Sequence, residues 1–206
     1  HKMNEYRALA RASEEKNIAH SKINILIRNT YRPQAFQKCI SSILSQTNQN
    51  FKVIMCYDDE RCLEYLEEYR SDSRFEIFKA GNVDKNKLAF YNLYCNELLE
   101  RVTEGWVMFL DDDDMLASKK ALDMISDHQF GTNSLIFWKF CRPDMLVFPD
   151  IDQLAQDTIA SSGYCFHSSH KHLSKWKSGY GEDHAFIEQL IDSRHFNRYF
   201  VVHYNG

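Results

Sequence analysis

The stretch that decides the fold is INILIRNTYRPQAFQKCISSILSQTNQNFKVIMCYDD, residues Ile23 to Asp59. It opens with a β-branched run, passes through the polar loop Asn29 to Pro33, and continues with apolar residues at helical spacing before a second β-branched run ends in two aspartates. This pattern predicts a strand over 23–27, a helix that buries Phe36 and its neighbours one turn away, and a strand over 51–56. Two parallel strands joined by a helix are the repeating unit of an α/β sheet.

The same alternation of strands and helices continues on both sides of this stretch. The expected elements are helices over 4–16, 60–69, 88–102 and 182–191, and strands over 75–79, 106–110, 134–140 and 198–203. Ser118 is expected to cap a helix. The fold class is therefore α/β, with a Rossmann-like, mainly parallel sheet flanked by helices, and its functional loops gather at the carboxyl ends of the strands.

Composition bounds the class of protein. The 206 residues are 44% apolar and 26% charged, which suits one globular domain. Lys and Arg number 25 against 29 Asp and Glu, so no basic surplus indicates nucleic acid as a partner. No apolar run approaches the ~20 residues that cross a bilayer, so no transmembrane segment is expected. The six cysteines stand singly, which favours buried thiols in a soluble, cytoplasmic protein.

Acidic residues follow two of the predicted strands. Asp111 to Asp114 come directly after the apolar run Trp106 to Leu110, and Asp58 and Asp59 end the second strand. Carboxylates this close repel one another unless a cation is present, and oxygen-only ligands on a short loop suit Mg²⁺ or Mn²⁺. The alternatives are a solvated acidic loop and ordinary helix capping. Because the chain has neither Gly-x-Gly-x-x-Gly nor a P-loop, any nucleotide would be held through a metal and side chains.

Three segments, in this order, resemble the successive motifs of family 2 glycosyltransferases with the GT-A fold. They are the opening stretch, then WVMFLDDDDML at 106–116, and GYGEDHAF at 179–186. The resemblance runs from about residue 23 to residue 186, which is most of the chain. It implies an inverting, hexosyltransferase-like enzyme that uses Mn²⁺ or Mg²⁺ to move a sugar from a nucleotide diphosphate donor to a hydroxyl group. The acceptor would be a carbohydrate or a glycoprotein.

The resemblance also assigns donor-binding residues. Thr30 and Tyr31 match the family's loop after the first strand, where the aromatic ring packs on the base, and Arg32 follows at a commonly basic position. Asp59 matches the carboxylate that accepts from the N3–H of the base, a contact that uracil offers and cytosine does not, so a UDP-sugar is favoured. The family usually has Gly-Ser or Asn-Ser after the paired aspartates, whereas this chain has Glu-Arg at 60–61.

The metal ligands and the base come from the same resemblance. The four-aspartate run contains the family's Asp-x-Asp motif, which makes Asp113 the direct metal ligand and Asp111 its partner near the ribose. Asp112 lies between them and belongs to the predicted donor site. Asp183, preceded by an acidic neighbour, matches the catalytic base. His203 matches a histidine near the C-terminus that completes the metal shell in some GT-A enzymes.

Elementary chemistry agrees with these roles. Breaking the glycosyl–phosphate bond builds negative charge on the departing diphosphate, which a metal held by Asp113 can neutralise. The acceptor hydroxyl has a pKa far above neutral, so a carboxylate within hydrogen-bond reach assists its attack. Asp183 would open a helix whose buried side carries Phe186, Ile187, Leu190 and Ile191. The alternative for Asp183 is an ordinary acid favoured at a helix N-terminus.

Several residues and functions stay open at this level. Trp138, Trp176 and Tyr180 would either stack on an acceptor sugar or belong to the core or a lid. The three histidines between 167 and 172 are expected to be solvated rather than ligands. Three other functions compete with sugar transfer: a nucleotidyltransferase on a related sheet, a non-catalytic module that binds sugar nucleotides or carbohydrates, and a structural acidic domain.

One main domain is expected, because no Gly-, Ser- or Pro-rich linker interrupts the chain. Residues 1–22 would form an N-terminal helical segment whose first two residues are a tag remnant. Residues 23–206 would form the GT-A domain, with a nucleotide-binding half over 23–117 and an acceptor-binding half over 118–206. A longer parent protein is compatible with both ends.

Overall fold

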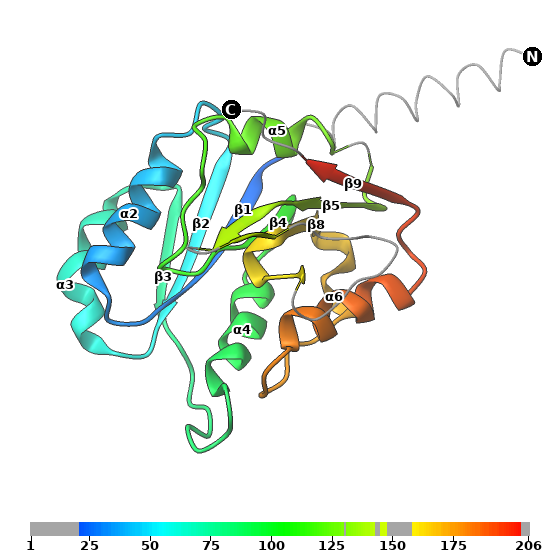
Figure 1. The fold of residues 1–206 in the computed structure, drawn as a ribbon. Coiled ribbons are helices and arrows are strands. Elements are labelled where there is room, and N and C mark those ends of the chain that lie inside the picture. The colour runs from blue at the N-terminus through cyan, green and yellow to red at the C-terminus, as the bar shows by residue number, and fades with distance from the viewer. Residues whose placement is uncertain (1–20, 130, 143–144, 148–157, 203–206) are drawn as a thin grey trace, which may run out of the picture.

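A seven-stranded sheet forms the centre of the structure, a computed structural model that describes residues 21–129, 131–142, 145–147 and 158–202. The strand order is β3-β2-β1-β4-β8-β5-β9 (Figure 1). The strands are β1 (Ile23–Asn29), β2 (Phe51–Tyr57), β3 (Phe75–Lys79), β4 (Trp106–Phe109), β5 (Ser134–Trp138), β8 (Tyr164–His167) and β9 (Arg198–Val202). A separate antiparallel pair consists of β6 (Phe140–Arg142) and β7 (Met145–Val147).

Strand direction brings the functional loops to one edge of the sheet. Neighbouring strands run parallel, except that β8 is antiparallel to both β4 and β5. In the register of β1, Asn29 pairs with Tyr57 of β2, and Leu26 pairs with Phe109 of β4. The loops after β1, β2 and β4 therefore leave the same edge, and the residues before β8 return to it. The predicted mainly parallel α/β sheet is confirmed.

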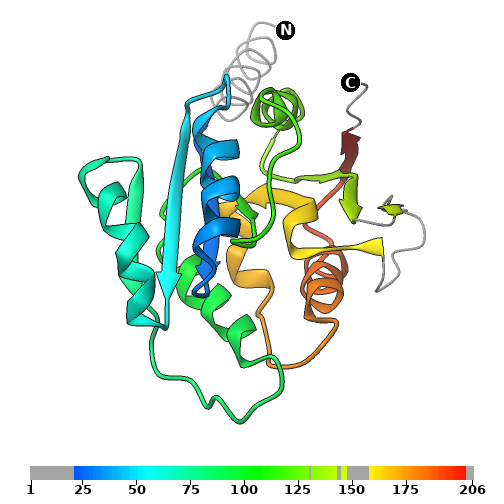
Figure 2. The same ribbon diagram turned by 60° about the vertical axis from the view of Figure 1, so that its left-hand side comes forward.

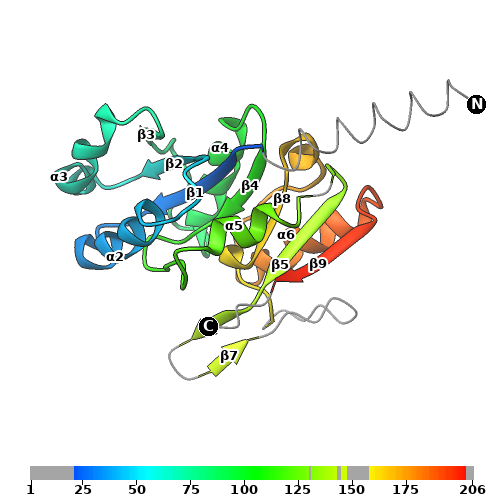
Figure 3. The same ribbon diagram turned by 90° about the horizontal axis from the view of Figure 1, so that it is seen from above.

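Helices cover both faces of the sheet, as Figures 2 and 3 show from two further directions. They are α2 (Pro33–Leu44), α3 (Leu63–Leu66), α4 (Tyr94–Glu100), α5 (Ala121–Ser126) and α6 (Glu182–Asp192). Ile25 and Ile27 of β1 pack with α2, α3 and α5 in one apolar cluster, whereas Leu26 packs with α4 and α6 in the other. Successive side chains of a strand point to opposite faces, so the consecutive apolar residues at 25–27 of β1 reflect the coverage of both faces.

Two predicted helices differ from the observed ones. The helix expected over 60–69 is divided into a 3₁₀ turn at 60–62, the short α3 and a second 3₁₀ turn at 67–71. The helix expected from Leu88 begins only at the 3₁₀ segment Phe90–Leu93, because Ala89 has a left-handed backbone (φ 47°) that interrupts helical geometry. The sequence pattern over 88–102 places Leu88 and Tyr91 on one helix face with Cys95. Cys95 is buried, but Leu88 and Tyr91 are exposed, at 58% and 42%, so this part of the prediction was wrong.

The second half shows three further differences. Ser118 does not cap a helix, because α5 begins at Ala121 with Lys120 at its N-cap, and the Ser118 hydroxyl accepts instead from the Lys120 backbone N–H. The strand expected over 134–140 ends at Trp138, and β6 follows as a separate strand. The central strand β8 was not predicted, because its four residues, YCFH, are too few to show a period-2 pattern.

Some predictions fall outside the described residues, including the helix over 4–16, most of the 1–22 segment, and His203. Within the described part, no helix is long and apolar enough to cross a membrane. Five of the six cysteines have described side chains, and all five are free and buried, as expected: Cys39, Cys56, Cys62, Cys95 and Cys165.

Candidate functional site

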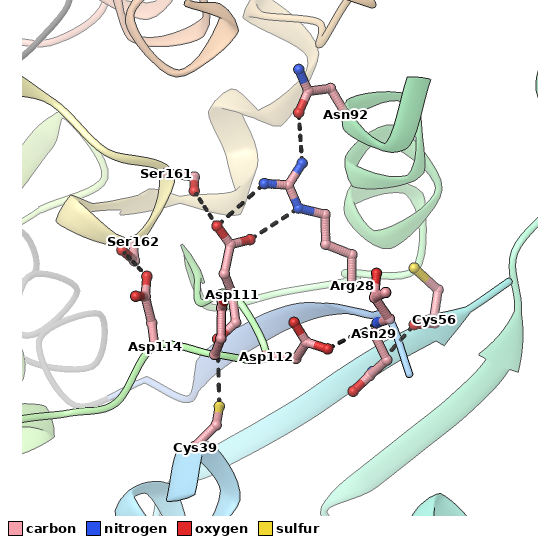
Figure 4. A network of polar contacts seen from close by, with 12 residues as sticks. Arg28, Asn29, Cys39, Cys56, Asn92, Asp111, Asp112, Asp114, Ser161 and Ser162 are labelled. Carbon is pink, nitrogen blue, oxygen red and sulfur yellow. Dashed lines mark hydrogen bonds and ion pairs between the residues drawn. The ribbon is translucent and has the colours of Figure 1, made fainter. Parts of the chain in front are cut away.

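Asp111 stands at the centre of the polar network that follows β4. Arg28, near the end of β1, donates to it from Nε at 2.9 Å and from Nη2 at 3.3 Å (Figure 4). The Ser161 hydroxyl donates to the same carboxylate at 3.3 Å. Ser161 precedes the antiparallel β8, so the reversed direction of that strand brings the second half of the chain to Asp111.

Asp112 ties the loop after β1 to the end of β4. Its side chain is fully buried, and it accepts from the Thr30 backbone N–H at 2.8 Å and forms an ion pair with Arg32. Burial raises the pKa of Asp112 to about 6, while the hydrogen bond from Thr30 and the charge of Arg32 oppose that rise. The carboxylate of Asp112 therefore faces the protein interior, whereas the carboxylate of its neighbour Asp113 is exposed to solvent.

Asp113 offers the most accessible carboxylate of the run. Its side chain is 44% exposed and pairs with Arg32, which is similarly exposed. Asp114 is held inward, because the Ser162 hydroxyl donates to it at 2.7 Å, and Trp138 in turn donates from its indole N–H to the Ser162 carbonyl at 2.7 Å. Burial, together with the charges of the neighbouring aspartates, raises the pKa of Asp114 against the effect of the Ser162 hydrogen bond.

A divalent cation is compatible with this group of side chains. Among the residues that the structure describes, no three His, Cys, Asp or Glu side chains come together as a complete cation cage. Mg²⁺ and Mn²⁺, however, commonly bind through one or two carboxylates and complete their shells with water and substrate phosphates. Asp113 supplies such an accessible hard oxygen donor, and its present partner is itself a positive charge. The residues therefore fit a metal that shares its shell with a diphosphate.

Tyr31 and Asp59 lie together at the neighbouring loops, with Arg61 between them. The Arg61 guanidinium lies over the Tyr31 ring at 4.5 Å from its centroid, and its Nε donates to both oxygens of Asp59 at 3.0 and 3.1 Å. The hydrogen bonds from Arg61 lower the pKa of Asp59 to about 2. Asp59 also accepts from the Arg61 backbone N–H and so caps the 3₁₀ turn, which was the structural alternative considered for it.

Asp183 lies in the first turn of α6, and its electrostatic neighbours come from the first half of the chain. Burial raises the pKa of Asp183 to about 6; Arg28 lowers it, Asp111 raises it, and a hydrogen bond from the Ser161 backbone N–H lowers it. The same α6 turn is anchored by Phe186 and Ile187, which are fully buried as predicted. The structure thus brings Asp183 to the edge that carries Asp111.

Two polar residues of the site, Arg28 and Asn92, were missed by sequence reasoning. Arg28 is the one charged residue of a mostly apolar strand, and a largely buried arginine requires an acidic partner, so it carried a usable signal. Asn92 carried a weaker one, as a polar residue among the apolar residues before α4. Its Oδ1 accepts from Arg28 Nη1 at 2.6 Å.

The remaining aromatic and histidine candidates differ in their burial. Trp176 is 1% exposed and stacks on Phe186, so it belongs to the core rather than to an acceptor surface. Tyr180 is 74% exposed. His167 ends β8 and packs edge-on against Trp106, the first residue of β4, which places it at the sheet edge opposite the aspartates. The prediction that these histidines are solvated was wrong for His167 and His170, which are partly buried, His170 against the ring of Phe196. His172 is exposed, as predicted.

Several solved structures share this fold. TarS of S. aureus, residues 1–349, superposes with a TM-score of 0.68 at 15% identity, covering 88% of this chain and 58% of that one. TarS in complex with UDP-GlcNAc gives 0.65 at 16% identity, covering 88% and 56%. The mannosyltransferase PcManGT from Pyrobaculum calidifontis, in complex with GDP-Man and Mn²⁺, gives 0.59 at 10% identity, covering 87% and 54%. The chain therefore spans less than two thirds of these proteins.

The fold is that of the GT-A glycosyltransferases, as predicted. The sequence profile described as Glycosyl transferase family 2 matches residues 24–148, more than half of the chain. The chain belongs to glycosyl transferase family 2, which confirms the family predicted from its motifs. No curated protein matches it in sequence.

Proposed function

We propose that the chain is an inverting, metal-assisted glycosyltransferase that moves a sugar from a UDP-sugar to a hydroxyl of a carbohydrate or glycoprotein acceptor. The observation that carries this proposal is that Ser161 donates to both acids, from its hydroxyl to Asp111 and from its backbone N–H to Asp183, while the charge of Arg28 acts on both carboxylates. The two aspartates come from opposite halves of the chain. A base and a donor-binding acid must approach one reacting centre from two sides, and this edge of the sheet supplies both.

The uracil would bind between the loops after β1 and β2. Tyr31 offers a ring for the base to stack on, and Asp59 offers a carboxylate for its N3–H. In the structure, both groups contact Arg61, so uracil would enter as the Arg61 guanidinium turns away. TarS has been solved with UDP and with UDP-GlcNAc, which supports a uridine donor, while the mannosyltransferase with GDP-Man makes guanosine donors the necessary comparison.

Asp113 would hold Mn²⁺ or Mg²⁺ beside the diphosphate, and Asp111 would orient the ribose. When bound, the cation neutralises the negative charge that develops on the departing UDP. Asp112 contributes by fixing the Thr30 backbone beneath the donor, and Arg32 adds a second positive charge at the same place. His203 would complete the metal shell.

Asp183 would act as the base. It takes the proton from the acceptor hydroxyl while the oxygen attacks the anomeric carbon and the bond to UDP breaks on the opposite face, so the configuration inverts. With a pKa of about 6, the carboxylate is ionised at neutral pH and close to the range in which a general base is most effective.

The test is a panel of UDP- and GDP-sugars incubated with the protein and Mn²⁺, with release of the nucleoside diphosphate as the readout. A UDP-sugar should be hydrolysed slowly in the absence of an acceptor. Asp183→Asn should abolish turnover and keep the Kd for UDP within about threefold, because the base contacts the acceptor rather than the nucleotide. Asp113→Ala should remove the dependence of UDP affinity on Mn²⁺ in calorimetry.

Other outcomes would replace the proposal. UDP binding without turnover of any donor would indicate a non-catalytic binding module. Formation of a nucleotide sugar from a sugar 1-phosphate and a nucleoside triphosphate would indicate a nucleotidyltransferase. Equal loss of UDP affinity and turnover in Asp183→Asn would remove Asp183 from the role of base.

A further inference from the structure

Arg28 makes more directed contacts than an ion pair with Asp111 requires. Its side chain is only 16% exposed, and its Nε, Nη1 and Nη2 all donate hydrogen bonds (Figure 4). Two of these nitrogens hold Asp111, and the third donates to Asn92 at 2.6 Å. The Tyr91 ring packs against the guanidinium at 5.0 Å. A planar fork held in this way has a fixed orientation, which a flexible lysine would not have.

Asn92 continues the connection into the second half of the chain. It is 6% exposed, and both ends of its amide are used. Oδ1 accepts from Arg28, and Nδ2 donates to the Gly179 carbonyl at 2.9 Å. The bond to Arg28 therefore fixes which end of the amide faces Gly179. A continuous path of hydrogen bonds runs from Asp111 through Arg28 and Asn92 to Gly179.

Gly179 begins the short loop that leads to Asp183. Gly179 and Gly181 both have positive φ, at 146° and 78°, which are backbone conformations that other residues rarely adopt. The segment between them has no helix or strand of its own, and α6 starts only at Glu182. The place of this loop relative to β1 therefore depends on contacts such as that from Asn92.

We propose that Arg28 and Asn92 are positioning residues that set the place of Asp183 relative to Asp111, and so align the base with the donor. This inference rests on the proposed function for its catalytic meaning, although the connection itself does not. Misplacing a reacting group by about 1 Å can cost on the order of 100-fold in rate, so a rigid link between the two halves has a direct catalytic use.

Hydrogen exchange of the ligand-free full chain, followed by mass spectrometry, tests the connection without any activity. Asn92→Asp keeps an acceptor for Arg28 but replaces the donor to the Gly179 carbonyl with a carboxylate oxygen. It should speed exchange over residues 179–183 by about fivefold or more, which corresponds to the loss of one hydrogen bond. Arg28→Lys should do the same, although residue 28 does not touch that segment. If Arg28→Lys leaves exchange over 179–183 unchanged, the connection is overturned.

Asn96 is the matched control. It lies in α4, and its amide bonds the Trp176 backbone at 3.0 Å in both directions, but neither bond involves Arg28. Asn96→Ala should speed exchange near Trp176 and leave 179–183 as in the wild type. An equal effect of Asn96→Ala on 179–183 would contradict a specific role for Arg28 and Asn92. Asn92→Asp preserves side-chain volume and decides the question alone if Arg28→Lys does not fold.

The proposed effect of Arg28 and Asn92 on catalysis is tested by steady-state kinetics. The donor is the nucleotide sugar that the panel of UDP- and GDP-sugars identifies. Asn92→Asp should lower kcat about 100-fold while the Kd for UDP stays within about twofold. An unchanged kcat together with faster exchange would overturn the catalytic role and leave only a structural tie. If no nucleotide sugar is processed at all, the proposed function fails, whereas the exchange measurement still decides whether Arg28 and Asn92 hold the loop.

Discussion

Replacing Asp183 by Asn tests whether a charged base is held in a buried site at the expense of stability. Burial, with Asp111 nearby, raises the pKa of Asp183 from 3.8 to about 6 even though Arg28 opposes the rise. That change corresponds to ~3 kcal/mol of lost stability in the folded protein at neutral pH. Asparagine has the same shape and no charge. Asp183→Asn is therefore expected to raise the free energy of unfolding at pH 7 by up to ~3 kcal/mol, or ~6–12 °C in Tm.

The stability difference between the wild type and Asp183→Asn should depend on pH. Because the pKa of Asp183 is higher in the folded than in the unfolded state, the folded protein binds this proton more tightly. The wild type therefore loses stability as the pH rises from about 4 to about 6, whereas the asparagine variant does not. The difference in unfolding free energy between the two should be close to zero at about pH 4, grow up to about pH 6, and stay constant above it.

Urea denaturation, followed by tryptophan fluorescence at several pH values, measures this difference. Asp192→Asn is the matched control, because Asp192 is exposed at the other end of the same helix, and its effect should be small at every pH. A variant Asp183→Asn that is no more stable than the wild type at pH 7 would refute the reasoning, since the carboxylate would then have no unfavourable environment to relieve.

Three further predictions concern the rate, the nucleotide and the fold. Turnover should rise with pH through about 6 and then level off, as the Asp183 carboxylate ionises; a flat profile between about pH 5 and 7 would exclude it as the base. Arg61→Ala should tighten UDP binding in calorimetry several-fold, because the guanidinium no longer competes for Tyr31 and Asp59, and weaker binding would mean that Arg61 helps to hold the base. Gly105→Ala should lower the free energy of unfolding by ~2 kcal/mol or more in urea, because Gly105 has φ +84° and an added Cβ would clash with the Lys22 carbonyl oxygen; Gly131→Ala, where the nearest atom is a side-chain oxygen, should cost less.

The elements that could be predicted are those whose burial repeats along the chain. β1 and β2 are covered on both faces, so each contains a run of consecutive apolar residues, 25–27 in β1 and 53–56 in β2, and their type is visible in the sequence. The elements that were missed have no such pattern. β8 is only four residues long. The helix expected from Leu88 begins only after Ala89, because Ala89 has a left-handed backbone that its residue type does not predict.

The site divides in the same way. Asp59 and the run that starts at Asp111 could be located because parallel strands bring the loops after them to a common edge, whichever residues those loops contain. The partners of these acids could not be located. Arg61 turns back onto Tyr31 and Asp59, and Arg28 reaches Asn92, through side-chain contacts that depend on how separate segments pack.

By itself, the sequence determined the class of sheet, the family and the edge at which the acidic groups collect, because the type of each strand and the place where it ends follow from local apolar patterns, and the order of the motifs indicates the family. Only the tertiary structure decided that Asp183 lies within electrostatic reach of Asp111 and Arg28, and that Asn92 donates a hydrogen bond to the loop before Asp183. The physical reason is range: periodicity is a property of neighbours along the chain, whereas a hydrogen bond between residues 64 or 87 positions apart exists only once the two halves have packed together.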